Sequence, residues 1–567
     1  MLPSLQEKQK FVRVVLTKEQ ALEMFADNPF KMATIKSKVV DGTYTSAYRC
    51  GPLIDLCLGP HIPSADKIKA FAVKSHSSAY YAGDEKNDSL QRVYGVAFPE
   101  KQMMKDFEAQ MKLLEEYDHR KVGLAQELFF FHELSPGSAM FLPRGAVIYN
   151  NLVKFIQEQY WKRGYTEVVS PNIYNTQLWQ QSGHWKHYQD NMFSFYDADN
   201  TQYALKPMNC PGHCLMFDHR VRSYRELPIR MADFGTLHRN EKSGALTGLT
   251  RVRRFQQDDG HIFCRMDQVQ EEVMGALEFM KEIYGIFGMS YTLDLSTRPA
   301  KACGLETATG VKNWDDAEEA LRQALNQFTS DGNDTGNLKP GQWKYNHGDG
   351  AFYGPKIDIK VYDIVQRKHQ CATIQLDFQL PINFDLKYKS GKEPTEEERA
   401  RLADPANLQA NEKPLLPGFE RPVIVHRAML GSVERMIAVL TEHFQGKWPF
   451  WLSPRQIMVV PVHQDHYPYA REVAKVLYDA GFHAEADCGE NTMNKKVREA
   501  QVAMYNFILV VGGEEVEKRG VNIRTRSNKR LGEGNTWAKG YMGLDDAIAF
   551  FTEIKNRHER DPLSGPQ

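Results

Sequence analysis

The most informative segment of this 567-residue chain is residues 238–255, which read HRNEKSGALTGLTRVRRF. Two arms that carry arginines flank a run rich in glycine, serine and threonine, and this pattern predicts a β-hairpin. The guanidinium groups of Arg239 and Arg251 suit bidentate phosphate binding, and Phe255 offers a ring on which a base can stack. On composition alone, a solvated basic hairpin is the more frequent alternative.

The segment Gly431-Ser432-Val433-Glu434-Arg435 shifts the balance toward a nucleotide site. It opens a predicted helix from Val433 to Phe444, and its small residues permit close backbone approach. Arg435 can reach a second phosphate from this position. The two segments together therefore favour phosphate binding.

Three residues far apart in the sequence, Cys210, His261 and His426, are candidate metal ligands. One thiolate and two imidazoles are suitable donors for zinc, and three protein ligands leave a fourth position for a substrate. The spacing matches no short metal-binding motif. The alternative is that Cys210 is a buried thiol and that each histidine is a hydrogen-bonded core residue.

Composition excludes several classes of protein. With 71 basic and 72 acidic residues the net charge is −1, so RNA binding would require a local basic surface. No stretch approaches the ~18 apolar residues of a membrane span, and the first twenty residues lack a signal or transit pattern. Eight cysteines are too sparse for a disulfide scaffold. These features predict a soluble protein of a reducing compartment.

Changes of texture along the chain predict four parts: residues 1–96, 97–122, 123–452 and 453–567. Short apolar runs broken by Gly-Pro pairs predict a small α+β unit in the first part. Apolar residues at every third or fourth position predict one long amphipathic helix from Pro99 to Val122.

The third part mixes helical segments, such as Val147 to Tyr160, with strand-like runs, such as Ile357 to Ile364 and Thr373 to Phe378. Successive strands without regular βα spacing favour an antiparallel sheet flanked by helices. We expect residues 331–341 to form a polar loop and residues 387–421 to form a surface insertion. In the last part, strands alternate with helices and predict a βαβ domain with a largely parallel sheet.

These segments resemble those of the threonyl-tRNA synthetase family of the eukaryotic cytosolic type, from about residue 40 to 560. Gly164 to Pro171 resembles motif 1 of class II synthetases, Phe234 to Phe255 resembles motif 2, and His426 to Arg435 resembles motif 3. Four further blocks resemble sequences that distinguish the threonine enzyme: Lys206 to His213, Gln257 to Cys264, Ala351 to Lys356, and Gln375 to Phe378. The resemblance implies an α+β class II fold, with an antiparallel sheet and flanking helices. An α/β anticodon-binding domain is expected to follow it, and a partial α+β editing domain to precede it.

The resemblance also implies a cytoplasmic homodimer that joins L-threonine to tRNA(Thr) through a threonyl-adenylate, with ATP, Mg²⁺ and one Zn²⁺ per chain. It makes Cys210, His261 and His426 the zinc ligands, with the threonine amino nitrogen and hydroxyl bound to the same ion. Valine is nearly isosteric with threonine, and a methyl-lined pocket would separate the two only about ten- to two-hundred-fold. An ion that requires an oxygen ligand rejects valine more strongly.

The same resemblance assigns the remaining residues of the active site. Those expected to contact threonine are Asp259, Tyr353, Gln375 and Gln257. Those expected to contact ATP or the adenylate are Arg239 (α-phosphate), Arg435 (γ-phosphate), Glu241, Arg251, Phe255 (adenine), Ser432, Lys356 and Gln370. His184 resembles a family histidine near the tRNA 3′ end, where it would act as a general base.

Serine also carries an amino group and a hydroxyl, so zinc alone does not exclude it and a second, hydrolytic site is needed. Asp55, Cys57 and His61 resemble one half of the family's editing site. The other half is a His-x-x-x-His pair upstream, and the sequence holds no histidine before His61. We therefore expect a truncated editing domain, no editing of Ser-tRNA, and partial misfolding of residues 1–96.

In the last part, Arg524 and Arg526 share one face of a predicted strand, with Lys529 and Arg530 following. Lys495, Lys496 and Arg498 lie on a predicted helix nearby. A solvated basic edge is an equally good interpretation of the residues alone. The family resemblance assigns Arg524, Arg526 and Glu514 to recognition of the anticodon loop.

Two other functions compete with the ligase. One is a synthetase-derived RNA-binding protein that has lost aminoacylation, which would have no reason to keep all six of these residues: Arg239, Arg435, Cys210, His261, His426 and Asp259. The other is a zinc hydrolase, but no Glu or His base stands next to a ligand as such enzymes usually arrange it.

Overall fold

The computed structural model describes residues 6–84, 86–300, 302, 308–330, 343–362, 367–393, 396, 415–526 and 540–558. The chain divides into two compact units, Met1–Glu115 and Glu116–Gln567. The predicted loop 331–341, most of the predicted insertion, Lys529 and Arg530 lie outside the described residues. Within the described ranges, no helix combines the length and apolar character that a membrane crossing requires.

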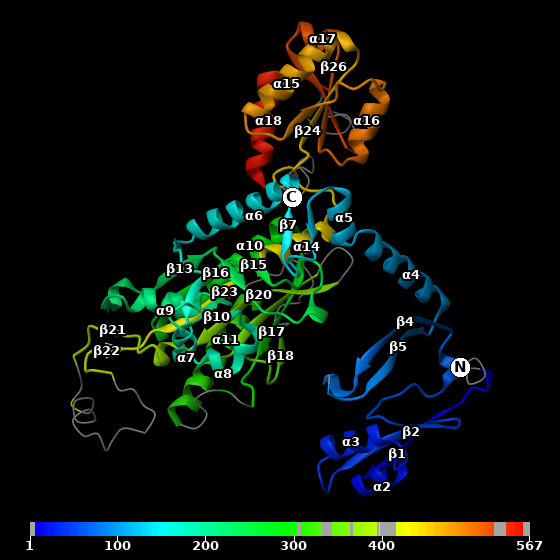
Figure 1. Ribbon diagram of the computed structural model, residues 1–567, viewed down its shortest axis with the longest axis vertical. Coiled ribbons are helices and arrows are strands. Elements are labelled where there is room, and N and C mark those ends of the chain that lie inside the picture. Colours follow the sequence, from blue (N-terminus) through cyan, green and yellow to red (C-terminus); the bar gives the residue numbers. More distant parts are fainter. Residues whose placement is uncertain are drawn as a thin grey trace. The chain divides into compact units, whose positions relative to one another are not determined.

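The first unit contains a three-stranded antiparallel sheet and a separate two-stranded hairpin (Figure 1). Alternation in the hairpin leaves most of its side chains exposed, so the core of this unit is small: Leu16, Ala21, Phe25, Ile35 and Ala47. The elements are β1 (Phe11–Thr17), α2 (Lys18–Met24), α3 (Pro29–Lys38), β2 (Tyr44–Cys50), β3 (Leu53–Leu56), β4 (Ala70–Tyr80), β5 (Ser89–Phe98) and α4 (Lys101–Glu116).

The predicted single helix from Pro99 to Val122 is wrong. Helix α4 ends at Glu116, and a new helix, α5 (His119–Ala125), begins after two intervening residues. The cause is Asp118, whose carboxylate accepts a hydrogen bond from the backbone N–H of Arg120 at 2.8 Å and so caps α5. Amphipathic periodicity continues through this break, so the apolar pattern alone could not locate it.

An eight-stranded sheet is the centre of the second unit, in the order β18-β17-β19-β20-β23-β16-β13-β8. All pairs are antiparallel except the two at its edges, in agreement with the antiparallel sheet predicted from the sequence. Its strands are β8 (Thr166–Glu167), β13 (Ile229–Asp233), β16 (Asp259–Cys264), β17 (Ser290–Ser296), β18 (Lys344–Asn346), β19 (Lys356–Tyr362), β20 (Lys368–Asp377) and β23 (Val423–Ala428).

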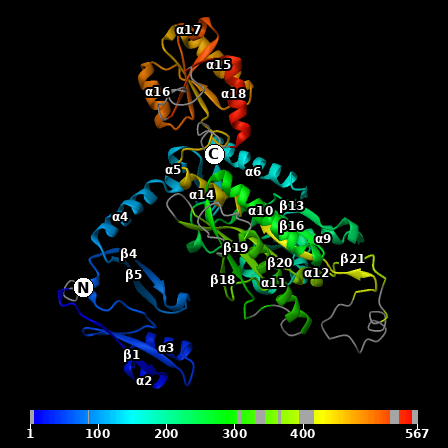
Figure 2. The same ribbon diagram turned by 180° about the vertical axis from the view of Figure 1, so that it is seen from behind.

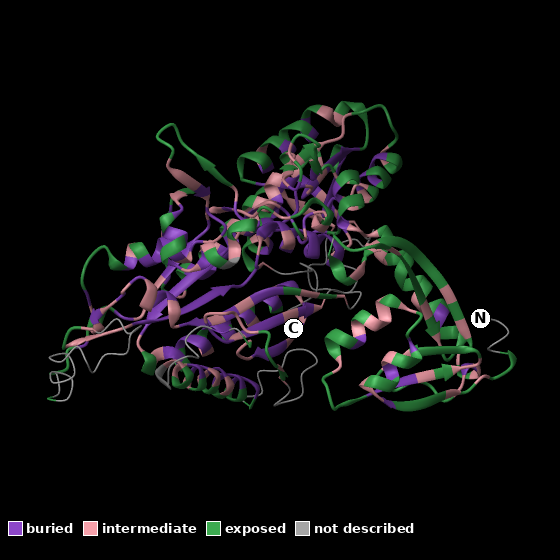
Figure 3. Cartoon of the chain, turned by 60° about the horizontal axis from the view of Figure 1, so that its bottom comes forward, coloured by how far each residue is buried: buried purple, intermediate pink, exposed green. Residues whose placement is uncertain are grey.

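Helices bury one face of this sheet. The core joins them to apolar side chains of the strands, and the central strands appear as the buried layer in Figure 3. The main helices are α5, α6 (Pro143–Trp161), α10 (Val269–Phe287), α11 (Ala308–Ser330) and α14 (Val433–His443). The other face carries the shorter helices α7 (Gln177–Gln181), α8 (His184–Tyr188), α9 (Cys210–Asp218) and α12 (Gln379–Asn383).

Short strands surround the sheet. The predicted hairpin is present as the antiparallel pair β14 (Thr236–His238) and β15 (Arg254–Gln256). The ends of the predicted insertion pair with each other as β21 (Tyr388–Lys389) and β22 (Phe419–Glu420). The remaining strands are β6 (Phe129–Phe131), β7 (Ala139–Phe141), β9 (Ile173–Asn175), β10 (Ser194–Tyr196), β11 (Gln202–Leu205) and β12 (Arg222–Ser223).

The last part forms a five-stranded sheet, in the order β25-β24-β26-β27-β28. Side chains alternate along β24 and β26 between two cores, one with α15 and α18 and the other with α16, so helices cover both faces (Figures 1 and 2). The elements are β24 (Ile457–Pro461), α15 (Tyr467–Asp479), β25 (Ala484–Ala486), α16 (Met493–Val502), β26 (Phe507–Val511), α17 (Gly513–Glu517), β27 (Gly520–Thr525), β28 (Tyr541–Gly543) and α18 (Leu544–Arg557).

The prediction of a largely parallel sheet here is only half right. Strands β25, β24 and β26 are parallel, whereas β27 and β28 are antiparallel additions. No helix of crossover length lies between β26 and β27, because residues 512–519 alone separate them and hold only the five-residue helix α17. The chain must therefore return in the opposite direction.

Candidate active site

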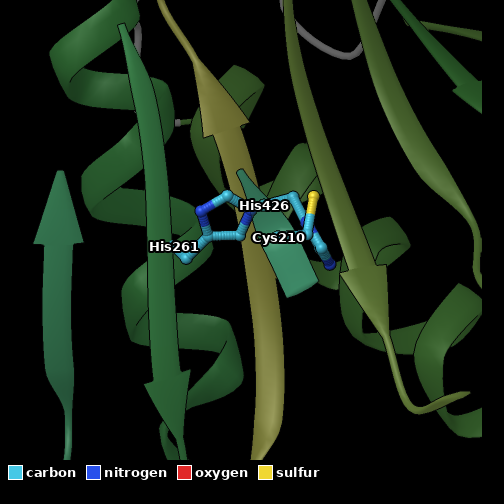
Figure 4. Close-up of side chains that lie close together, drawn as sticks. All are labelled: Cys210, His261 and His426. Carbon is cyan, nitrogen blue, oxygen red and sulfur yellow. The ribbon is translucent and has the colours of Figure 1, made fainter. Parts of the chain in front are cut away.

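Cross-strand register brings the predicted metal ligands together. His261 on β16 and His426 on β23 are direct partners, and Gln375 on β20 is the next residue in the same row. Cys210 enters from the first residue of α9, as Figure 4 shows. Donor atoms of Cys210, His261 and His426 all lie within 4.8 Å of one another. Residues distant in sequence thus form one compact donor set.

Hydrogen bonds fix how the two imidazoles are oriented. The Nε2 atom of His426 lies 2.9 Å from Asp377 Oδ2, and the Nδ1 atom of His261 lies 2.8 Å from His213 Nδ1. Among the described residues, the buried Nε2 of His261 has no hydrogen-bond partner. Burial lowers the pKa of the His261 imidazole and raises the pKa of the Cys210 thiol. An orphaned nitrogen beside a thiol and a second imidazole fits a zinc ion.

A second layer of polar residues supports these side chains. His213 lies one turn after Cys210 on α9, and its Nε2 is 3.5 Å from Asp233 Oδ2. Asp233 accepts a 2.5 Å hydrogen bond from Ser170, whose hydroxyl accepts one from Lys206 at 2.8 Å. Sequence reasoning gave His213 and Asp377 no role. The Cys-x-x-His spacing on a helix was the one signal that could have indicated His213.

Three of the four predicted threonine residues surround this donor set. Asp259 lies two positions before His261 on the same face of β16, and its Oδ2 accepts from Asn209 at 3.0 Å. Burial raises the pKa of the Asp259 carboxyl. The Tyr353 hydroxyl donates to Gln375 Oε1 at 2.5 Å, and the Tyr353 ring centroid lies 5.6 Å from that of His426. Gln257 lies instead in the wall of the neighbouring cavity.

That cavity, of about 370 Å³, lies against the β14–β15 hairpin and the first turn of α14. Six of the predicted ATP residues line it: Arg239, Glu241, Arg251, Phe255, Ser432 and Arg435. The carbon centre of the Arg239 guanidinium lies 5.0 Å from the centroid of the Phe255 ring. Arg435 donates from Nε to the carbonyl of Thr250 at 3.0 Å. A cationic cavity with an aromatic wall suits a nucleoside polyphosphate.

Lys356 and Gln370 do not line this cavity. Both side chains bind Asp358 instead, Lys356 Nζ at 2.9 Å from Oδ2 and Gln370 Nε2 at 2.8 Å from Oδ1. The backbone carbonyl of Gln370 accepts from Arg435 Nη1 at 2.9 Å. Gln370 therefore contacts Arg435, in the wall of this cavity, through its backbone carbonyl.

His184 is buried at the start of α8, with Nδ1 2.9 Å from the Ser182 hydroxyl. Its ring centroid lies 5.7 Å from that of Phe352 and 6.4 Å from that of Tyr353. It therefore lies next to Tyr353, whose hydroxyl donates to Gln375. A general-base role for His184 stays a prediction.

The residues assigned to editing lie in the first unit. Asp55 pairs with Lys31 at 2.6 Å, and Cys57 Sγ accepts from the N–H of Gly59 at 3.4 Å. His61 packs against the ring of Tyr48, with centroids 4.3 Å apart. The expected loss of editing and misfolding of residues 1–96 stay predictions.

The three residues predicted to recognise the anticodon loop differ in the groups that they contact. Arg526 donates to the backbone carbonyls of Trp448 and Lys447 at 3.3 and 3.2 Å, and Glu514 pairs with Lys518 at 2.7 Å. The buried Nε of Arg524 has no hydrogen-bond partner in the part of the chain that the structure describes. Lys496 does not fit the alternative of a solvated basic edge, because this residue is buried and donates to the Tyr467 hydroxyl at 3.3 Å.

Comparison with known families gives the class of protein first. Residues 193–406 match the class II tRNA synthetase core domain of the G, H, P, S and T enzymes, and residues 456–554 match an anticodon-binding domain. Residues 45–94 match the second additional domain of threonyl and alanyl tRNA synthetases. The chain is therefore a class II aminoacyl-tRNA synthetase, an enzyme class that uses ATP with Mg²⁺ and binds tRNA.

Full-length relatives give the family. Cytoplasmic threonine–tRNA ligase 1 of mouse and of human are each 54% identical over 530 residues, covering 93% of this chain and 68% of the relative. The cytoplasmic enzyme of Saccharomyces cerevisiae is 52% identical over 525 residues, covering 92% of this chain and 66% of the relative. The chain belongs to the threonine–tRNA ligase family.

Solved structures agree with this assignment. The structure described as the RNA binding domain of threonyl-tRNA synthetase from Cryptosporidium parvum is 47% identical, with a TM-score of 0.67, and covers 77% of this chain and 98% of that one. The putative threonyl-tRNA synthetase ThrRS-1 of Aeropyrum pernix is 28% identical, with a TM-score of 0.60, covering 80% and 96%.

Proposed function

We propose that this chain activates L-threonine with ATP to threonyl-adenylate, transfers threonine to tRNA(Thr), and selects threonine through a zinc ion. The zinc assignment rests on the buried Nε2 of His261, which has no hydrogen-bond partner among the described residues. Donor atoms of Cys210 and His426 lie within 4.8 Å. Burying such a nitrogen without a partner is costly, and a metal bond would satisfy it.

Bound zinc would supply a Lewis-acidic position that takes the amino nitrogen and hydroxyl of threonine. Cys210, His261 and His426 would hold the ion, while Asp377 and His213 orient the two imidazoles. Asp259 is close enough to the donor set for its carboxylate to accept a hydrogen bond from the threonine hydroxyl. Asn209 donates to one of its two oxygens. Valine lacks the hydroxyl that this arrangement requires.

The adjacent cavity would hold ATP with its Mg²⁺. Arg239 would stabilise the α-phosphate as the threonine carboxylate displaces pyrophosphate, and Arg435 would bind the γ-phosphate. Phe255 would stack on adenine, Glu241 and Arg251 would contact the nucleotide, and Ser432 caps the helix that presents Arg435. Lys356, Gln370 and His184 would act after rearrangement around the substrates, since their present partners are protein groups.

We assign residues 123–452 to the catalytic domain, 453–567 to the anticodon-binding domain, 97–122 to a linker and 1–96 to part of an editing domain. Arg524, Arg526 and Glu514 are proposed anticodon contacts. A cytoplasmic location is proposed because the relatives named above are named as cytoplasmic enzymes. A homodimer is proposed from the family resemblance alone. A polypeptide made of these 567 residues alone is proposed not to edit Ser-tRNA.

Metal analysis tests the zinc assignment directly. Purified protein should contain about one zinc per chain, and the Cys210→Ser variant should lose most of it because a hydroxyl is a far weaker zinc ligand. Cys488→Ser in the last domain is the matched control, since Cys488 is a free cysteine remote in sequence from all three ligands. Equal zinc content in both variants would contradict the assignment.

A further inference from the structure

The buried residue His119, at the start of α5, uses every polar atom of its ring. Its Nδ1 lies 2.7 Å from Glu442 Oε1, and its Nε2 accepts a hydrogen bond from the backbone N–H of Leu249 at 3.1 Å. The His119 backbone N–H also donates to Glu442 Oε1, at 3.1 Å. Both side chains are only about 5% exposed. Sequence reasoning gave His119 and Glu442 no role.

These contacts define one protonation state of the ring. An amide N–H can donate only to an unprotonated nitrogen, so Nε2 carries no hydrogen. The proton is therefore on Nδ1, from which it is donated to the Glu442 carboxylate. Burial lowers the pKa of His119, which favours this neutral form. The ring thus joins one donor and one acceptor in a fixed orientation.

The segment held by His119 is part of the wall of the ATP cavity. Leu249 is in the turn of the β14–β15 connection, where Thr247 and Arg251 form a backbone bridge. The next three residues, Thr250, Arg251 and Val252, line the cavity. Gly248 approaches the ring so closely, at φ +47°, that an added Cβ would lie 2.2 Å from His119 Nε2.

The other partner of His119 connects to the opposite wall of the same cavity. Glu442 is in the last turn of α14, whose first turn carries Arg435 and whose N-cap is Ser432. Arg435 in turn donates to the carbonyl of Thr250. The turn at 247–251 is thereby bound at Leu249 through His119 and at Thr250 through Arg435, and both bonds lead to α14. Arg367 also binds Glu442 and neutralises its buried charge.

We propose that His119 is a positioning residue for ATP: its imidazole, held by Glu442, fixes the Leu249 amide and so sets the conformation of residues 250–252 in the nucleotide wall. The proposal rests on the proposed ATP site. His119 itself touches no substrate in this arrangement. Its loss should therefore act on ATP binding and leave recognition of threonine unchanged.

Two substitutions distinguish the contact that His119 Nδ1 makes with Glu442 from the contact that its Nε2 makes with Leu249. His119→Gln can place an amide oxygen where Nε2 accepts from Leu249, whereas His119→Asn reaches only Glu442. ATP–pyrophosphate exchange should show the KM for ATP raised about ten-fold in His119→Asn, the typical effect of one lost hydrogen bond to a buried group, with the KM for threonine within two-fold of wild type. His119→Gln should recover most of the ATP affinity. Arg120→Ala, which changes an exposed neighbour, is the control.

Hydrogen exchange supplies a readout independent of activity and of the proposed function. The Leu249 amide should exchange slowly in wild type and in His119→Gln, and faster in His119→Asn without ATP. A wild-type protein without ATP–pyrophosphate exchange activity would overturn the proposed function. Hydrogen exchange at the Leu249 amide would then still decide the role of His119. Equal Leu249 exchange in all variants, or equal rises in the KM for ATP and for threonine, would overturn the positioning role.

Discussion

At the scale of single residues, the site depends on how buried polar atoms are satisfied. His261 is 1% exposed; its Nδ1 lies 2.8 Å from His213 Nδ1, and its Nε2 has no hydrogen-bond partner among the described residues. His426 is oriented by Asp377. A buried imidazole that merely fills a core would be expected to bond through both nitrogens or to be replaced by an apolar side chain. The unsatisfied Nε2 of His261 beside Cys210 and His426 supports the proposed zinc site.

The proposed role of Arg239 in stabilising the α-phosphate leads to a prediction of catalytic rate. Arg239→Ala should lower kcat for ATP–pyrophosphate exchange about 10²- to 10³-fold, because it removes a preorganised donor from the phosphate that becomes more negative in the transition state. Arg220→Ala is the control, since Arg220 is half exposed and pairs with Glu226. An Arg239→Ala enzyme with rates like those of the control would exclude this residue from the reaction.

The sequence allowed most of these residues to be named, but not their partners. Cys210, His261 and His426 could be proposed because donor types and the family resemblance agreed. His213, Asp377 and His119 were missed, because their roles depend on which side chains the register of β16, β20 and β23 and the packing of α5 place beside them. The burial of Lys496 could not be predicted either, because a charged residue on an amphipathic helix is usually exposed.

At the scale of elements, periodicity predicted the type of most segments and only approximate ends. The strands expected at Ile357 to Ile364 and at Thr373 to Phe378 are described as β19 and as part of the longer β20. The helix expected at Val147 to Tyr160 begins four residues earlier, because Pro143 occupies its first turn. The break between α4 and α5 was missed because a cap is a local hydrogen bond and has no period.

Close backbone packing at α6 leads to a prediction of stability. Gly145→Ala should reduce the free energy of unfolding by about 1–3 kcal/mol, since the new Cβ would lie 1.9 Å from the carbonyl oxygen of Leu128 and force the backbone to move. Gly275→Ala in α10 should raise it by about 0.5–1 kcal/mol, because no atom lies within 4 Å and alanine favours helices. Urea unfolding of both variants measures the difference, and equal effects would contradict the packing.

At the scale of the whole molecule, the antiparallel catalytic sheet and the α/β domain after it were predicted from texture and resemblance. The antiparallel strands β27 and β28 were not, because a short connection such as α17 leaves no sequence pattern as strong as a strand or a helix. The first unit has the smallest core, in keeping with the few apolar contacts that its separate hairpin can make.

The proposed absence of editing leads to a prediction about fidelity. The purified 567-residue polypeptide should leave Ser-tRNA(Thr) intact over times in which a family member with both halves of the site hydrolyses it, because the sequence has no histidine pair before His61. Release of serine from preformed Ser-tRNA(Thr) measures this. Rapid release that persists in a His61→Ala variant would show that another group of the chain edits.

The most direct test of the account is ATP–pyrophosphate exchange with threonine, serine and valine, before and after removal of the metal by a chelator. We expect exchange with threonine and serine, little with valine, loss of activity when the metal is removed, and recovery when zinc is returned. Exchange with valine at a rate near that of threonine, or full activity in protein shown to be free of metal, would contradict the selection of threonine by zinc at Cys210, His261 and His426.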